Sequence, residues 1–340
     1  MKCLISCGKV DINILFIIIG AIAKLVSKLI KKIKLTEIEE YPFIEGVNAA
    51  LGMTLSLIPF IFIKIYSHKS NQKEEYKNNL IIINSYKQHF REMRFQKYLL
   101  IFISCLFDCG QKILSFCLSK RINDNFWVFD IIFINIFSFF ILKTKLYRYQ
   151  YLSLLVIIIL GIFLNIIYFL KEFNINNDDK IMDILLNILL TLGVEILYSL
   201  TAVINKYSME KNFCIPYELS FYEGIFALIV NIILLKFAVP DNFSTYYNKI
   251  NSIEIILFIS MMLSRLIFNL FGLITIKIYT SSHIALLLVI GEIAFSLLEE
   301  YIWYLFIKII ICLILLFIVL VFTEIIELNF WGLKKDSEIN

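Results

Sequence analysis

The residues best suited to chemistry in this sequence are charged and polar side chains that stand inside long apolar runs. An ionised side chain at the centre of a membrane helix costs roughly 2.5–3.5 kcal/mol on insertion scales, so each such residue is a candidate for function. Glu195 is one charged residue of this kind. We expect the binding site for a small polar molecule to be built from the following residues: Glu45, Asp108, Lys112, Asp130, Tyr222, Glu223, Arg265, Asn269 and Glu292.

The basic members of this set have two roles open to them. Asp108 and Lys112 are four residues apart on one helix face, so they could neutralise each other as readily as hold a substrate. Arg265 could bind a phosphate or carboxylate in bidentate fashion. The alternative for Arg265 is a salt bridge to Glu223 or Glu292.

Glu45 and Glu223 head two similar stretches of sequence. Residues 43–51 and 221–229 share Phe, Glu, Gly and Ala in register, at an offset of about half of the 340-residue chain. Such an echo indicates two related halves. Both glutamates could instead be solvated carboxylates at the membrane boundary. Tyr222 could stack on a ring-shaped substrate or serve only in packing.

The composition excludes most classes of soluble protein. The hydrophobic fraction is 60% and the mean hydropathy is +0.81, against about 45–50% apolar residues in ordinary soluble domains. The net charge of +4 is scattered along the chain, which argues against a nucleic-acid partner. The seven cysteines form no Cys-x-x-Cys motif and the three histidines are dispersed, so we expect neither a metal site nor a cofactor.

The apolar runs predict an all-α polytopic membrane protein. Each run approaches the ~20 residues that cross the hydrocarbon core. Residues 67–96 are predicted to form a polar loop. The predicted transmembrane helices are 12–29, 41–65, 98–118, 126–142, 149–170, 184–205, 217–235, 253–279, 284–298 and 304–325.

Ten helices divide into two halves of five. Because five is odd, the second half enters the membrane from the opposite side, which makes an inverted repeat with the substrate site between the halves. Ile101 and Leu257 head similar starts of the third and eighth helices. The predicted division is 1–170 for the first repeat, 171–183 for the connecting loop, 184–326 for the second repeat and 327–340 for a cytosolic tail.

The distribution of lysine and arginine places both termini in the cytosol. The sequon at Asn242 then falls on the non-cytosolic side, where it is a candidate glycosylation site. Lys24 and Lys206 stand near the ends of corresponding helices, and we expect them to extend their ammonium groups to the membrane boundary.

Two motifs at helix junctions resemble one carrier family. The stretch 205–226 reads Asn-Lys-Tyr, then Lys-Asn, a proline and Glu-Gly-Ile-Phe. The stretch 140–161 contains Leu146, Gln150 and Gly161 at the junction of the fourth and fifth predicted helices.

A third motif is the carboxylate pair Glu299 and Glu300 at the end of the ninth predicted helix. Together with the ten-helix pattern, these stretches resemble the drug/metabolite transporter superfamily, and within it the solute carrier 35 (nucleotide-sugar transporter-like) and EamA-type branches. The resemblance implies a transporter that works by alternating access in an internal membrane of a eukaryotic cell. The sequence departs from the family at 143–145 and at Asp130, so the resemblance does not carry a substrate preference.

The favoured interpretation is therefore a secondary-active transporter of a small polar, anionic or nucleotide-sugar-like metabolite. Arg265 and Lys112 would bind the anion, and a carboxylate such as Glu223 would couple a proton or counter-ion. Two alternatives stay open: a non-transporting accessory or receptor-like membrane protein with the same fold, and a membrane-embedded transferase. The expected partners are a small-molecule substrate and the lipid bilayer of an internal (Golgi, vesicular or lysosomal) membrane, and a homodimer stays open.

Overall fold

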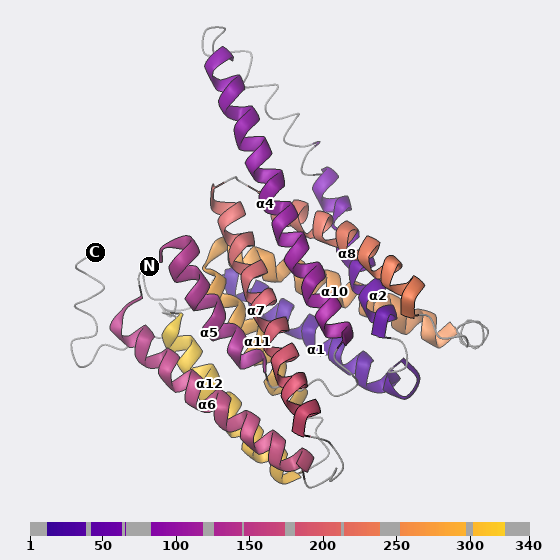
Figure 1. Cartoon of the computed structure of the whole chain (residues 1–340), viewed down its shortest axis with the longest axis vertical. Helices are drawn as coiled ribbons and strands as arrows, with labels where there is room; N and C mark the ends of the chain where they lie inside the picture. Colours follow the sequence, from indigo (N-terminus) through magenta and orange to yellow (C-terminus); the bar gives the residue numbers. More distant parts are fainter. Residues whose placement is uncertain are drawn as a thin grey trace.

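The computed structural model describes ten stretches of the chain, and their regular secondary structure is helical throughout. The described residues are 12–38, 42–62, 65, 83–117, 126–144, 146–173, 181–211, 214–238, 252–296 and 302–323. The helices are α1 (Ile12–Ile38), α2 (Pro42–Thr54), α4 (Ile83–Cys117), α5 (Trp127–Phe137), the π-helical turn η2 (Ser138–Leu142), α6 (Arg148–Phe173), α7 (Ile181–Lys211), α8 (Pro216–Ala238), α10 (Ser252–Ile278), the 3₁₀ turn η3 (Ser281–His283), α11 (Ile284–Ser296) and α12 (Ile302–Phe322) (Figure 1).

Five of these helices are long and apolar enough to cross a membrane. Their spanning segments are Phe95–Ser115, Arg148–Ile167, Leu186–Lys211, Pro216–Leu234 and Ile255–Ile278. Four shorter apolar helical segments accompany them, at Gly46–Phe62, Trp127–Leu142, Ser281–Ile293 and Phe306–Phe322. The prediction of a helical integral membrane protein is confirmed at this level.

Helix α4 is longer than its sequence predicted. It begins at Ile83, so residues 83–96 are helical, although we predicted a polar loop over 67–96. This stretch contains neither Gly nor Pro and is rich in Lys, Gln, Arg, Glu and Met. These residues are good helix formers, and the helix therefore continues beyond the apolar segment.

The predicted second helix is interrupted where the sequence suggested one continuous run. The helix pauses in a turn at Leu55 and Ser56 and resumes over 57–62. Pro59 explains the interruption, because its ring clashes with the carbonyl four residues earlier, at Leu55, and it has no N–H to donate. The Ser56 hydroxyl donates to the Met53 carbonyl over 2.7 Å and satisfies one of the acceptors that the turn exposes.

The helices pair in a pattern that joins the first part of the chain to the last. Helix α1 packs against α10 and α11, and α7 packs against α4 and α5. Helix α2 packs against α8, and α6 packs against α12. The labels in Figure 1 show α1, α7, α10 and α11 near the middle of the bundle, with α6 and α12 side by side at one edge.

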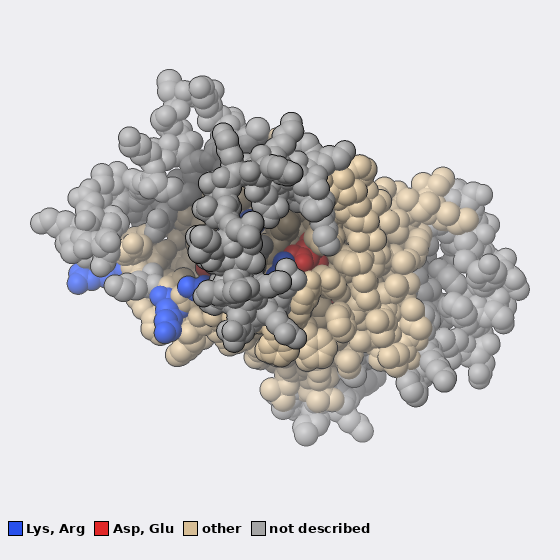
Figure 2. Space-filling model, turned by 90° about the horizontal axis from the view of Figure 1, so that it is seen from above, with Lys and Arg blue, Asp and Glu red and all other residues tan. Residues whose placement is uncertain are grey.

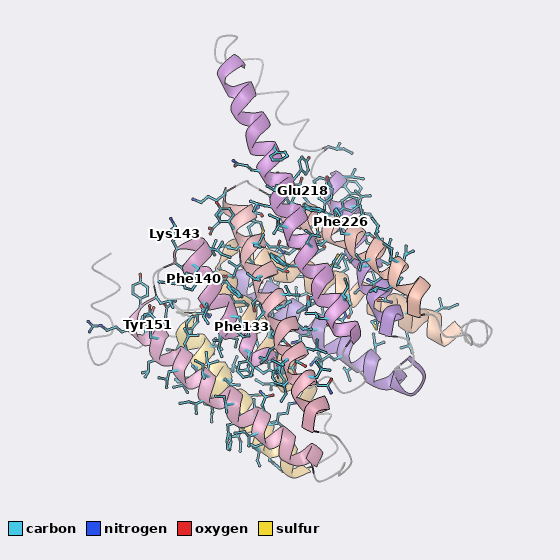
Figure 3. All side chains as sticks on the ribbon, in the orientation of Figure 1. Phe133, Phe140, Lys143, Tyr151, Glu218 and Phe226 are labelled. Carbon is cyan, nitrogen blue, oxygen red and sulfur yellow. The ribbon has the colours of Figure 1, made fainter. Side chains whose placement is uncertain are left out.

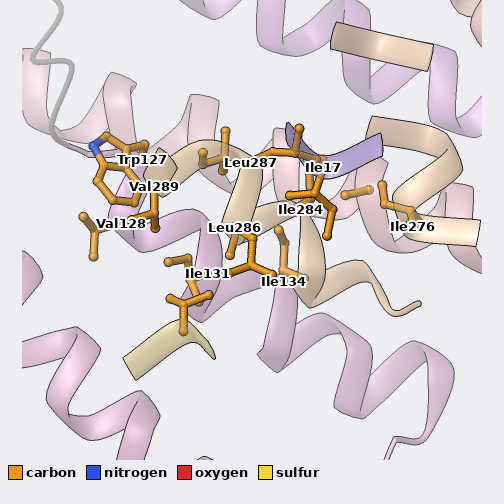
Figure 4. Close-up of a cluster of buried hydrophobic side chains, with 14 of the residues drawn as sticks. Ile17, Trp127, Val128, Ile131, Ile134, Ile276, Ile284, Leu286, Leu287 and Val289 are labelled. Atoms are coloured by element: carbon orange, nitrogen blue, oxygen red, sulfur yellow. The ribbon is translucent and has the colours of Figure 1, made fainter. Parts of the chain in front are cut away.

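The apolar core fills the space between these helices. Trp127, Ile131 and Ile134 of α5 are buried against Leu286 and Leu287 of α11 (Figure 4). The same cluster continues to residues of α1 and α10. The core thus lies at the meeting point of helices from both ends of the sequence.

The outer surface of the bundle is apolar, as a lipid environment requires. Phe140 is 70% exposed and Tyr151 is 54% exposed, and both point away from the bundle on the side of α5 and α6 (Figure 3). Seen from above, the described surface is mostly uncharged, with a few basic side chains at one edge and a small group of charged atoms near the centre (Figure 2).

Glycines hold α2 and α8 close together at the two Glu-Gly motifs. A Cβ at Gly224 of α8 would lie 2.6 Å from the backbone nitrogen of Thr54 in α2. A Cβ at Gly46 of α2 would overlap the side-chain amide of Asn231 in α8. The absence of a side chain at each glycine therefore lets the opposite helix approach closely. Small residues have this role in membrane helix packing.

Candidate functional site

Two lysines of α1 converge on one carboxylate of α11. The Lys28 ammonium donates to Oε1 of Glu292 over 2.5 Å, and the Lys24 ammonium lies 3.1 Å from the same oxygen. The Glu292 side chain is 1% exposed, while those of Lys24 and Lys28 are 13% and 19% exposed. Because ion pairs gain strength where water is excluded, this contact ties α1 firmly to α11.

Gly291 and Lys308 complete the surroundings of this carboxylate. A Cβ at Gly291 would lie 2.9 Å from Cδ of Lys24. The absence of a side chain at Gly291 therefore leaves room for the aliphatic part of Lys24, whose ammonium group reaches Glu292. Lys308 of α12 is 3% exposed and also interacts electrostatically with Glu292. Two ammonium groups therefore contact this carboxylate, and a third acts on it electrostatically.

A different arrangement joins α5 to α7. The side chains of Asp130 and Glu195 are hydrogen-bonded to each other. Two carboxylates offer only acceptors, so this bond forms only when one of the two groups carries a proton. Asp130 is 3% exposed, and the Ser199 hydroxyl donates to its Oδ1 over 3.4 Å. The arrangement places two carboxyl groups beside each other at the contact of α5 with α7.

Glu223 lies in a third setting, among neutral hydrogen-bond donors. Its Oε1 accepts from the Ser104 hydroxyl of α4 over 2.9 Å and from the Asn205 amide of α7 over 2.7 Å. Glu223 is only 4% exposed. The alternative of a solvated boundary carboxylate is therefore wrong for Glu223, which belongs to the buried interior.

One tyrosine marks where the acidic residues gather. Tyr198 of α7 is partly buried and interacts electrostatically with carboxyl groups from four helices. These groups are Asp108 of α4, Asp130 of α5, Glu195 of α7 and Glu223 of α8. The fold therefore brings together three acidic residues of the predicted site, and it adds Glu195 to them.

Arg265 and Asn269 lie one turn apart on α10, at the contact with α1. The Ser264 hydroxyl donates to the carbonyl of Ala23 over 3.1 Å. Arg265 follows Ser264 and Lys24 follows Ala23, so both basic residues stand at the same level of this helix contact. Asn269 buries its amide nitrogen, for which the described residues provide no hydrogen-bond acceptor.

The salt bridge of Arg265 to Glu223 or Glu292 stays an open alternative, although both carboxylates have other contacts. Glu292 contacts Lys24 and Lys28, and Glu223 accepts from Ser104 and Asn205. Tyr222 packs edge-on against Tyr98 of α4 at a ring-centroid distance of 6.2 Å, which matches the packing role that we left open for it.

Several predicted site residues lie outside the described part of the structure. Asn242 is among the residues whose placement the structure does not describe, as are Glu299 and Glu300. Glu45 and Lys112 belong to α2 and α4, but their side chains are not described. The roles predicted for these residues stay predictions.

The expectation that Lys24 extends to the membrane boundary is wrong, and that for Lys206 stays a prediction. Lys24 turns inward to Glu292. Lys206 is 5% exposed and donates to the carbonyl of Tyr279 over 2.7 Å, where it caps the end of α10. Both ammonium groups have hydrogen-bond acceptors inside the protein. These acceptors offset the cost of removing the charges from water.

The sequence analysis also missed members of the site. Lys28 and Lys308 were not singled out, although Lys24 and Lys28 are one helical turn apart inside an apolar run and Lys308 is flanked by apolar residues. That spacing is a signal that the sequence offered. Ser104 and Ser199 carried no such signal, because a serine in an apolar helix more often bonds to its own backbone.

Comparison with known proteins adds no relative. No protein-family model matches the chain, and no curated protein matches it.

Proposed function

We propose that this chain is a secondary-active transporter that moves a small polar, anionic or nucleotide-sugar-like metabolite across a membrane by alternating access. Ten transmembrane helices would form two inverted five-helix repeats, α1 to α6 and α7 to α12. This is the architecture of the drug/metabolite transporter superfamily, whose solute carrier 35 and EamA-type branches the sequence resembles.

The pattern of helix contacts supports two inverted halves. If α1 corresponds to α7, α4 to α10 and α5 to α11, then the contact of α1 with α10 has its counterpart in that of α7 with α4. The contact of α1 with α11 likewise corresponds to that of α7 with α5. Helices α2 and α8 correspond to each other and pack together, as do α6 and α12. An approximate two-fold axis between the halves would produce these pairs.

One observation carries the functional proposal: buried charges meet between helices of the two proposed halves. Lys24 and Lys28 come from the first half and Glu292 from the second. Ser104 comes from the first half and its acceptor Glu223 from the second. Buried ionic groups mark substrate and ion pathways in membrane proteins. Contacts of this kind can break and re-form as two halves move, which alternating access requires.

Uptake into proteoliposomes tests the function. The purified chain is expected to accumulate or exchange at least one member of a radiolabelled panel of nucleotide sugars, organic phosphates and amino acids. Arg265→Ala and Glu223→Gln are expected to reduce that uptake strongly, since Arg265 is the proposed anion ligand and Glu223 the proposed coupling carboxylate. Lys211→Gln is a matched control because Lys211 is exposed at the end of α7.

The outcome also separates the remaining alternatives. A folded chain that binds a member of the panel without moving it would be an accessory or receptor-like membrane protein. Full uptake in both variants would contradict the assigned residues but not the transport function.

The proposed setting is an internal membrane with both termini in the cytosol. The placement of the Asn242 sequon on the opposite side follows from this topology. Expression in eukaryotic cells is expected to give a glycosylated band that Asn242→Gln removes. Cytosolic accessibility of a tag placed after α12 tests the orientation independently.

A further inference from the structure

Three short contacts join Ser104, Asn205 and Glu223 into a closed ring. The Oγ atom of Ser104 lies 2.6 Å from Oδ1 of Asn205 and 2.9 Å from Oε1 of Glu223. The Nδ2 atom of Asn205 lies 2.7 Å from the same Oε1. The three residues are 0%, 3% and 4% exposed, so the ring is buried where α4, α7 and α8 meet.

The ring needs one more proton than its neutral members supply. Each contact lies within the usual range for a full hydrogen bond, so three contacts require three donated protons. The Asn205 amide donates one proton to Glu223, and the Ser104 hydroxyl has one proton to give. With Glu223 ionised, this hydroxyl donates either to Glu223 or to Asn205, and the remaining contact brings two acceptor oxygens together. A hydrogen shared between both oxygens would give two long contacts rather than two short ones.

The orientation of the Asn205 amide does not change this count. If the amide is turned over, its nitrogen donates to Ser104, Ser104 donates to Glu223, and two oxygens meet between Asn205 and Glu223. In both orientations the missing proton belongs to Glu223, because neither a serine hydroxyl nor a carboxamide gains a proton. Further contacts of the other Glu223 oxygen leave the three contacts of the ring as they are.

We propose that Glu223 carries a proton in this conformation, and that Ser104 and Asn205 hold this proton in a closed ring of three hydrogen bonds. The Glu223 carboxyl group donates to Ser104, Ser104 donates to Asn205, and Asn205 donates back to Glu223. This inference rests on the proposed function and identifies the coupling ion, which the sequence left as a proton or a counter-ion. Glu223 is the proton carrier, and Ser104 and Asn205 are its positioning residues.

Loss of the proton changes a contact between the two proposed halves. Ser104 belongs to the first half, whereas Asn205 and Glu223 belong to the second. When the proton passes to water, the carboxylate accepts from Ser104 and Asn205, and the facing oxygens of Ser104 and Asn205 repel each other. Two hydrogen bonds and one repulsion then replace three hydrogen bonds at the contact of α4 with α7 and α8. Release of the proton therefore favours separation of the halves, and protonation favours their closure.

Infrared difference spectroscopy of the full chain in neutral detergent tests the proton directly. Spectra at neutral and alkaline pH reveal protonated carboxyl groups by a C=O band that shifts on deuterium exchange. One such band of the wild type is expected to be missing from Glu223→Gln and present in the control Glu210→Gln. Glu210 is 50% exposed near the end of α7, so its carboxyl group lies outside the ring. The same bands in the wild type and in Glu223→Gln would overturn the proposal.

Ser104→Ala tests the ring while Glu223 stays in place. This variant removes the acceptor of the Glu223 proton, and a carboxyl group that donates a weaker hydrogen bond has a stiffer C=O bond. The Glu223 band is therefore expected at a higher frequency in Ser104→Ala and at the wild-type frequency in Ser208→Ala. Ser208 is a matched control, because it is a buried serine of α7 whose hydroxyl has no hydrogen-bond partner among the described residues. An unchanged band in Ser104→Ala would contradict the ring.

The pH dependence of stability gives an independent measurement. The native chain holds the Glu223 proton, whereas the unfolded chain releases it at neutral pH, so the stability falls as the pH rises. The amide of Glu223→Gln supplies the third donor of the ring and cannot lose it in this way. Its unfolding midpoint in SDS is therefore expected to fall less steeply between neutral and alkaline pH than that of the wild type. Equal slopes would overturn the proposal.

Other ionisable groups belong to the helices around Glu223 and titrate in the same experiment. These groups are Glu45 of α2, Cys105 and Asp108 of α4, Asp130 of α5, Glu195 and Tyr198 of α7, and Arg265 of α10. The wild type and Glu223→Gln share all of them. A difference between the two slopes therefore reports the proton on Glu223.

Failure of this proposal differs visibly from failure of the transport function. The infrared and stability measurements require no transport. A protonated Glu223 in a chain that moves no member of the substrate panel would keep the ring and remove the transport function. Uptake of a panel member by a chain without the Glu223 band would keep the transporter and remove the proton from Glu223.

Discussion

The contact of α1 with α11 and the contact of α5 with α7 occupy corresponding places in the proposed inverted repeat, yet their chemistry differs. In the first, two lysines bind one glutamate. In the second, an aspartate is hydrogen-bonded to a glutamate, which requires a proton between them. The first contact therefore depends on full charges and the second on a neutral donor. Corresponding helix contacts thus carry an ion pair on one side and two neighbouring carboxyl groups on the other.

The largest expected difference comes from removing Glu292. Glu292→Gln leaves Lys24 and Lys28 buried without their carboxylate, and breaking a buried ion pair from one side costs about 3–5 kcal/mol. The unfolding midpoint in mixed detergent and SDS micelles, without added anion, measures this loss. Glu210→Gln is the control, because Glu210 is 50% exposed and its partner Lys206 keeps the carbonyl of Tyr279 as an acceptor when the carboxylate is lost. Equal losses of stability in Glu292→Gln and Glu210→Gln would contradict the special role of the ion pair between α1 and α11.

An intermediate effect is expected at Glu223, which is bound by neutral groups. Ser104→Ala removes the hydroxyl that lies within donating distance of both the Glu223 carboxylate and the Asn205 side-chain oxygen, and so removes the one hydrogen bond that this hydroxyl can donate. Hydrogen bonds between membrane helices average about 0.6 kcal/mol and reach about 1.7 kcal/mol, and its place in a ring of linked hydrogen bonds puts this one near the upper end. Ser208→Ala is the control, since the buried Ser208 hydroxyl has no hydrogen-bond partner among the described residues. A larger loss in Ser208→Ala would contradict the assignment.

A smaller effect is expected when the path of the Lys24 stem is closed. Gly291→Ala adds a Cβ 2.9 Å from Cδ of Lys24, and the lysine must shift away from Glu292. Gly272→Ala adds a Cβ whose nearest neighbour is 3.7 Å away, which is ordinary contact. Replacing a helical glycine by alanine favours the helix by up to about 1 kcal/mol. We therefore expect Gly272→Ala to raise the melting temperature and Gly291→Ala to leave it unchanged or lower it.

The smallest effect is expected at Asp130. Asp130→Asn replaces a carboxyl group by an amide that can still donate to Glu195, so the hydrogen bond survives and the loss stays below about 1 kcal/mol. The same SDS titration measures it. A loss as large as that of Glu292→Gln would show that Asp130 is an ionised partner of Lys24, and the contrast between the two contacts would disappear.

The sequence predicted the elements better than the contacts between them. Apolar length alone located the helices, since run length follows from the thickness of the membrane. It overlooked the polar continuation of α4 and the break caused by Pro59, where helix propensity and proline geometry act independently of hydropathy. Glu223 and Glu292 were identified because buried charge is unusual.

The partners of these residues could not be predicted in the same way. Glu292 and Lys28 are 264 residues apart in the chain, and only the packing of α1 on α11 brings them together. Lys24 lies near the end of an apolar run, and from there its long side chain could point either to the membrane boundary or into the protein. We assigned it to the boundary. Whether the Lys24 ammonium group contacts water or a buried carboxylate depends on which residue of α11 lies beside it. The sequence around Lys24 does not contain this information.

The reciprocal glycine contacts of α2 and α8 also limit how the molecule can move. Backbone meets backbone at Gly224 and Thr54, and backbone meets a side-chain amide at Gly46 and Asn231, with no layer of flexible side chains between. A sliding motion along this seam would drive other Cβ atoms into the opposite backbone. Rotation about the line of contact keeps these close approaches in place, so α2 and α8 would be suited to act as the pivot of the rocking motion that the proposed alternating access requires.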